Sequence, residues 1–127
     1  MNTILLAVNG TLMRGLELNQ NLLDAGAEFV EETMTAPEYR LWTINDVHPA
    51  MQRVETAGRE ILLEVWEVPV GGISQILMQE PPGLCIGKVK LVDGRMVLGV
   101  LGEAALCADQ TEITEHGGWR RYCDQAS

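Results

Sequence analysis

A glutamate that directly follows a short apolar segment is the strongest candidate for acid–base chemistry. Ile76 and Leu77 share one face of a predicted helix over residues 73–79, and Glu80 comes next, before two prolines. A carboxylate held against apolar neighbours has its charged form disfavoured, so its pKa should rise toward neutrality. Such a group suits a general acid or base. The alternative is a solvated glutamate at a helix end, because glutamate is rarely buried.

A turn near the N-terminus is the second candidate. Residues 4–8 form a short apolar run that predicts a buried strand, and Asn9-Gly10-Thr11-Leu12 follows it. Asn9 and Gly10 tolerate positive φ, and Thr11 can cap a following helix. A strand that ends in a glycine turn exposes several N–H groups in one direction, and such a concavity binds oxyanions. Asn9, Gly10, Thr11 and Leu12 are therefore predicted to bind substrate, with an ordinary strand-turn-helix connection as the alternative.

Three basic side chains are further candidates. His48 is predicted in a polar loop beside Pro49, where a neutral imidazole can donate a hydrogen bond to a substrate oxygen. An exposed loop histidine is the alternative. Arg40 and Arg120 can each pair with a substrate carboxylate in bidentate fashion. For both arginines, pairing with the many surface acids is the favoured alternative.

Two strings resemble known proteins. Asn9-Gly10-Thr11-Leu12 resembles the Tyr-Gly-Ser-Leu loop of the γ-glutamylcyclotransferase-like superfamily. Residues 9–19 resemble still more closely the C-terminal domain of allophanate hydrolases, and so do residues 35–41 and 117–120. The resemblance implies a barrel-like sheet with peripheral helices, and chemistry that needs no metal or organic cofactor.

The resemblance also implies roles for two of the candidates. In cyclotransferases the catalytic glutamate stands at the end of a similar helix, in a Leu-Asp-x-x-Glu-Gly pattern. Glu80 matches the glutamate of that pattern, although Pro81 replaces the glycine and no aspartate precedes it. Allophanate hydrolase domains generally lack this glutamate, and a loop histidine near position 48 has been linked to their activity. The chain thus combines the loop of one branch with the glutamate of the other.

Three functions fit these residues. The first is an acid–base enzyme of the superfamily acting on a γ-glutamyl, amide or ureido compound, with the loop holding an oxyanion and Glu80 moving a proton. The second is a stand-alone relative of the allophanate hydrolase domain acting on a carboxylated urea-like product beside an amidase. The third is a non-catalytic subunit that binds a small molecule or an amidase. Asn9 in place of tyrosine favours the second and third, whereas Glu80 favours proton transfer.

The elements that must position these residues are mostly strands. Alternating or apolar patterns predict strands over residues 27–36, 39–44 and 59–68. Asp93-Gly94 predicts a two-residue type I′ hairpin between residues 84–92 and 95–101. Helices are predicted over residues 16–25 and 73–79, and a helical turn over residues 111–114. The prediction is one α+β domain over residues 1–127, a small mixed β-barrel, closed or nearly closed, with short peripheral helices.

Two carboxylates and three tryptophans lie on these predicted elements. Glu64 and Glu67 occupy opposite faces of the strand over residues 59–68, so one of them is expected to point into the barrel mouth. An error of one residue in register would exchange them. Trp42, Trp66 and Trp119 are expected in the core.

Composition limits the partners and the compartment. The net charge of −9 argues against nucleic acid and anionic membranes as partners. No apolar run approaches the roughly 20 residues that a membrane span needs, and the N-terminus lacks the basic segment of a signal peptide. Three cysteines without a close pair indicate free thiols, and no metal-ligand spacing is present. The expectation is a cytoplasmic protein that binds a small carboxylate, amide or ureido ligand.

Overall fold

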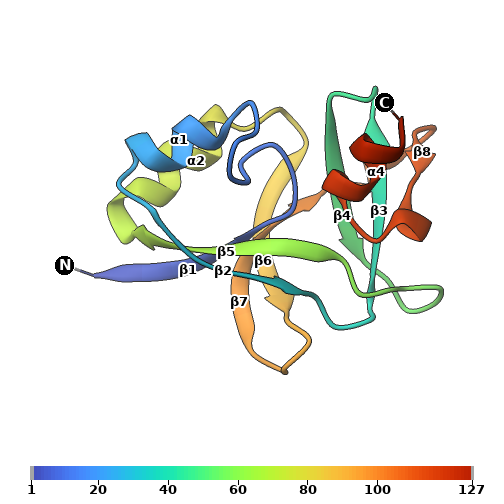
Figure 1. Ribbon diagram of the computed structural model, residues 1–127, viewed down its shortest axis with the longest axis horizontal. Helices are drawn as coiled ribbons and strands as arrows, with labels where there is room; N and C mark the ends of the chain where they lie inside the picture. The colour runs from blue at the N-terminus through green and yellow to red at the C-terminus, as the bar shows by residue number, and fades with distance from the viewer. Residues whose placement is uncertain (1, 127) are drawn as a thin grey trace.

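The computed structural model describes residues 2–126, which form two sheets and several short helices (Figure 1). The strands are β1 (Thr3–Val8), β2 (Glu28–Met34), β3 (Tyr39–Ile44), β4 (His48–Arg53), β5 (Leu62–Pro69), β6 (Leu84–Lys90), β7 (Met96–Gly102) and β8 (Thr111–Glu112). The helices are α1 (Asn19–Asp24), α2 (Ile73–Gln79), α3 (Ala104–Cys107) and α4 (Trp119–Ala126), with 3-10 turns at Val70–Gly72 and Thr114–His116. The predicted α+β class is confirmed.

The larger sheet has the strand order β2-β5-β1-β7-β6. Strand β1 pairs antiparallel with β5 and parallel with β7, so it lies at the centre of the sheet. Central strands are buried on both faces, which explains why residues 6–8 are nearly inaccessible to solvent. The segment that leaves the C-terminal end of β1 therefore starts from a rigid position.

The expected barrel was closed or nearly closed, and the fully closed form is wrong. The edge strands β2 and β6 of the larger sheet meet only at one end, through a bridge between Thr35 and Leu91. Pro37 follows this bridge and carries no N–H, so it cannot continue the pairing. Strand β3 instead joins a second sheet with the order β4-β3-β8 (Figure 1).

The hairpin around Asp93-Gly94 is confirmed, but its turn differs from the prediction. Leu91 N–H donates to the carbonyl of Arg95, which leaves three residues in the turn. Gly94 has φ +93°, whereas Asp93 does not have positive φ. A type I′ turn needs positive φ at both central residues, so this is a longer turn with glycine at its last position. The Asp93 carboxylate accepts the Arg95 N–H and so supports it.

Two predicted local structures were wrong because both segments pair with strand β3. Thr111 and Glu112 form strand β8 against Thr43 and Trp42, instead of a helical turn. His48 begins strand β4 opposite Ile44, instead of lying in a polar loop.

The core lies between the larger sheet and helices α1 and α2, which contribute the buried residues Leu22 and Ile76 (Figure 1). Trp66 and Trp119 are buried in it as predicted, whereas Trp42 is only partly buried beside a smaller cluster. All three cysteines are free. Within residues 2–126, every helix is too short or too polar to cross a membrane.

Candidate functional site

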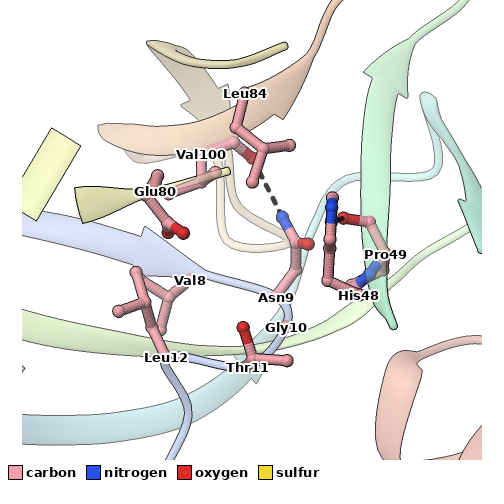
Figure 2. A pocket seen from close by; sticks show the side chains of 10 residues that line it. All are labelled: Val8, Asn9, Gly10, Thr11, Leu12, His48, Pro49, Glu80, Leu84 and Val100. Atoms are coloured by element: carbon pink, nitrogen blue, oxygen red, sulfur yellow. Dashed lines mark hydrogen bonds between the residues drawn. The ribbon is translucent and has the colours of Figure 1, made fainter. Parts of the chain in front are cut away.

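A cavity opens where the chain leaves β1, between the larger sheet and the β3–β4 hairpin (Figure 2). It measures about 250 Å3, including space open to solvent, and its inner part has room for about one water molecule. We call residues 9–12 the loop wall, and His48 with Pro49 the hairpin wall. The lining residues are Val8, Asn9, Gly10, Thr11, Leu12, His48, Pro49, Glu80, Leu84 and Val100.

The loop wall keeps its backbone N–H groups free. Its carbonyl oxygens are engaged: Gly10 accepts from the Met13 N–H, Thr11 from the Leu18 N–H, and Leu12 from the Asn19 side-chain amide. In contrast, the N–H groups of Gly10, Thr11 and Leu12 have no acceptor within residues 2–126. The loop can therefore donate to a ligand.

Side chains of the loop wall are also arranged around the cavity. The Asn9 side-chain amide donates to the carbonyl of Val100 at 2.9 Å, which fixes its orientation and links the loop to β7. The Thr11 hydroxyl points into the cavity and has no partner among the described residues (Figure 2). These polar atoms can contact a small bound molecule.

Gly10 is required for a reason other than the one predicted from sequence. Neither Asn9 nor Gly10 has positive φ. A Cβ atom at Gly10 would lie 2.6 Å from Cδ of Pro49, which is far inside van der Waals contact. Glycine thus allows the loop wall to touch the hairpin wall.

Glu80 shares this cavity with the loop wall, as predicted. It ends helix α2 with an extended backbone, and its N–H donates to the carbonyl of Leu77. Its half-buried carboxyl group points toward Val8 and Leu12 (Figure 2). Burial raises the pKa of this carboxyl from its usual value near 4.5 to about 7. Near neutral pH the group therefore exists in both protonation states, as an acid–base catalyst requires.

The raised pKa of Glu80 predicts a pH-dependent stability. A carboxyl group whose pKa is higher in the folded state stabilises the fold at pH values below its unfolded-state pKa. This contribution is lost as the pH rises through the folded-state pKa of about 7. Relative to Glu80→Gln, the wild type should therefore lose on the order of 2 kcal/mol of unfolding free energy between about pH 4.5 and about pH 8. Urea unfolding of both proteins across this range measures it, and a difference that stays constant with pH would contradict the prediction.

His48 lines the cavity but cannot act as first expected. The side chain is buried, and its Nδ1 lies 3.0 Å from the carbonyl oxygen of Pro49. In the neutral imidazole this nitrogen must carry the proton, because a carbonyl only accepts. Neutral His48 thus has no N–H left for a substrate oxygen, and its Nε2 is an acceptor.

Arg40 lies away from the cavity. Its guanidinium pairs with the carboxylate of Glu112 on β8 and lies over the ring of Trp42, 5.4 Å from the ring centroid. This is the surface pairing that the sequence analysis favoured. Among the described residues, no lysine or arginine lines the cavity, so any anion there would have to be bound by neutral donors.

A buried carboxylate beneath the loop was not assigned from sequence. Glu64 is inaccessible to solvent and accepts from the N–H and Nε of Arg14, from Nε1 of Trp66 and from Nη2 of Arg120. Burial acts to raise its pKa, but these donors together lower it. The sequence signal was present in the alternating strand, and the register decides that Glu64, opposite Val8, faces inward. Glu67 is exposed.

Comparison with known proteins decides the family. The model of the family described as "Allophanate hydrolase C-terminal domain" matches residues 4–124. The chain belongs to this family. It is 29% identical to the urea amidolyase of Lachancea kluyveri over 130 residues, covering 97% of the chain and 7% of that enzyme. The family domain thus spans only a small part of the curated relatives it matches.

Solved structures agree with this family assignment. The crystal structure of c4763, described as a uropathogenic E. coli-specific protein, has 56% identity and a TM-score of 0.97, with 98% of each chain covered. The K. lactis urea amidolyase has 28% identity and a TM-score of 0.94, covering all of this chain and 8% of that one. An aig2-like protein from Mus musculus, with 19% identity, a TM-score of 0.63 and 86% and 82% of the two chains covered, shares the fold alone. The family domain has the γ-glutamylcyclotransferase-like fold.

Proposed function

We propose that this protein is a proton-transfer enzyme that breaks a C–N bond in a small, carboxylated, urea-like anion. The single observation that carries the proposal is that Glu80, with a pKa of about 7, lines the same cavity as Gly10, Thr11 and Leu12, whose N–H groups have no acceptor within residues 2–126. The loop wall would receive an oxyanion, and the carboxyl group would supply the proton. Asn9, Gly10, Thr11 and Leu12 are the proposed binding residues.

Binding by the loop wall would depend on the protonation of Glu80. Only neutral donors would surround the bound anion, so nothing would offset the negative charge of an ionised Glu80 in the same cavity. The ionised carboxylate would therefore repel the anion, and a low local dielectric constant strengthens this repulsion. By linkage, an anion that binds better to the protonated form also raises the pKa of that carboxyl. The substrate complex would therefore hold Glu80 as the acid at neutral pH.

The proposed reaction follows from this arrangement. Glu80 donates its proton to the nitrogen that carries the carboxyl group of the substrate. The C–N bond breaks, its electron pair stays on the nitrogen, and the carboxyl carbon leaves as CO2. The step consumes no water, so the cavity has to hold only the substrate. His48 would accept a hydrogen bond from a substrate N–H group through Nε2.

The names of the relatives support the substrate class and a partner. Allophanate, named in the family description, is a carboxylated urea, and the curated relatives are longer enzymes called urea amidolyases. We propose that this chain acts beside an amidase in the cytoplasm. The place of Glu80 at the end of α2 and the shared fold keep γ-glutamyl cyclotransfer as the second candidate.

A ligand titration followed by nuclear magnetic resonance tests the binding site. Malonamate, in which CH2 replaces the bridging NH of allophanate, is a stable probe. We expect it to shift the amide signals of Gly10, Thr11 and Leu12, and to bind more weakly at pH 8 than at pH 6, roughly as the ionised fraction of Glu80 grows. Malonic diamide, which lacks the carboxylate, is the matched control.

Three outcomes would redirect the proposal. Shifts confined to other regions would place the ligand site elsewhere. Turnover of γ-glutamyl amines, with release of 5-oxoproline and no effect of malonamate, would favour the cyclotransferase function. Binding of malonamate without turnover of allophanate or of small ureido acids would favour a non-catalytic binding subunit.

A further inference from the structure

Helix α4 contacts residues next to both walls of the cavity, although it contacts neither wall itself. Figure 1 shows α4 beside the β3–β4 hairpin, on the opposite side of the N-terminal loop from α1 and α2. Its start is anchored to the larger sheet: the Leu62 N–H donates to the carbonyl of Gly117, and Trp119 is buried in the core. A Cβ atom at Gly118 would lie 3.1 Å from Cβ of Leu62, so glycine allows this close approach.

On one side α4 reaches the end of the loop through Arg120. The Nη2 of Arg120 donates to the carbonyl oxygen of Arg14. It also donates to Oε2 of Glu64, at a distance of 3.2 Å. Glu64 also accepts the Arg14 N–H at 2.9 Å. The main chain of Arg14 is thus held through both its N–H and its C=O. Because Glu64 pairs with Val8 across the sheet, the same carboxylate ties the end of the loop to its beginning.

On the other side α4 reaches the hairpin through Tyr122. Its hydroxyl donates to the carboxylate of Asp46, in the turn that precedes His48. Asp46 has φ +58°, and its N–H donates to Oγ1 of Thr43 at 3.1 Å. The Tyr122 ring packs against Trp119 with centroids 5.7 Å apart. Residues two apart on a helix point to opposite sides, so Arg120 and Tyr122 can reach different walls.

We propose that helix α4 sets the relative position of the loop wall and the hairpin wall, with Arg120 and Tyr122 as positioning residues. The proposal rests on the proposed function, because it assumes that this cavity binds the ligand. The loop belongs to the larger sheet and His48 to the smaller one, so their alignment depends on groups that contact both. Movement of α4 would therefore change the binding site without any contact between the helix and the ligand.

The test compares Arg120→Gln, Tyr122→Phe and the double variant with Arg121→Gln in the full chain. Arg121 is the matched control, because it is the next residue on the helix, is exposed, and donates no hydrogen bond to the loop or the turn within residues 2–126. Amide hydrogen exchange without ligand is measured first at Arg14 and Leu18, and at Asp46 and Val47. Malonamate affinity is measured second.

Arg120→Gln should speed exchange at Arg14 and Leu18 by about tenfold, since it removes charge-assisted hydrogen bonds. Tyr122→Phe should speed exchange at Asp46 and Val47 by roughly threefold, because its hydrogen bond is exposed. Each variant should weaken malonamate binding, and Arg120→Lys should restore part of the loss. Arg121→Gln should change neither quantity.

Unchanged exchange at both segments in folded Arg120→Gln and Tyr122→Phe would overturn the proposal. So would faster exchange spread evenly over the whole chain, because that is the signature of a general loss of stability. If the wild type does not bind malonamate, the proposed ligand fails, and the exchange measurements still decide whether α4 holds the two walls.

Discussion

Replacement of Glu80 by glutamine should lower turnover by roughly a hundred- to ten-thousandfold while leaving the fold intact. Glutamine keeps the size and hydrogen-bonding capacity of the side chain but cannot donate a proton. Because burial holds the pKa of Glu80 at about 7, the wild type supplies this proton near neutral pH. The change removes the charge that would oppose an anion, so Glu80→Gln should still bind malonamate and should lose the pH dependence of binding.

Initial rates with allophanate or another ureido acid, and malonamate titrations at several pH values, measure these effects. Glu67→Gln is the matched control, because Glu67 is exposed on β5 and lies outside the cavity. An unchanged rate in Glu80→Gln would assign the proton transfer to another group, with His48 the next candidate in the same cavity. Loss of both rate and binding would make Glu80 a binding residue.

Replacement of Glu64 by glutamine should lower the unfolding free energy by about 3 kcal/mol. Each carboxylate oxygen of Glu64 faces two donors: Arg14 N–H and Trp66 Nε1–H at one, and Nε of Arg14 and Nη2 of Arg120 at the other. An amide turns one of these oxygens into a donor, so two donors lose their acceptor. Arg14 and Arg120 are partly exposed and can be hydrated, which limits the cost.

The effect should depend on pH in the opposite sense from that of Glu80. The folded pKa of Glu64 lies below its usual value near 4.5, so its contribution is present above that value and is lost as pH falls through the folded pKa. Urea unfolding of Glu64→Gln and of the control Glu67→Gln, at pH 7 and below pH 4, tests this. Equal stability of the two variants at pH 7 would show that the buried carboxylate contributes little.

The local pattern of the sequence was sufficient for several features. Alternation and apolar runs located the strands, and Asp93-Gly94 located a hairpin, because side-chain period and turn chemistry are local properties. The cavity shared by Glu80 and the loop wall was also predicted, but through the resemblance to a family, since no local rule brings two segments about seventy residues apart together.

What only the tertiary structure decided depends on how the strands pair. His48 is buried because β4 pairs with one edge of β3. Arg40 pairs with Glu112 because β8 lies along the other edge of β3. The larger sheet stays open because β3 belongs to the second sheet. Glu64 faces inward because of its register opposite Val8, and Arg120 reaches the loop across a separation of 106 residues. Sequence alone located six of the strands and helices α1 and α2, but not strands β4 and β8 or helices α3 and α4. The pairing partners and the register of the strands determined which polar side chains meet in the cavity and beneath its loop. A register shift of one residue would turn each side chain to the opposite face of the sheet.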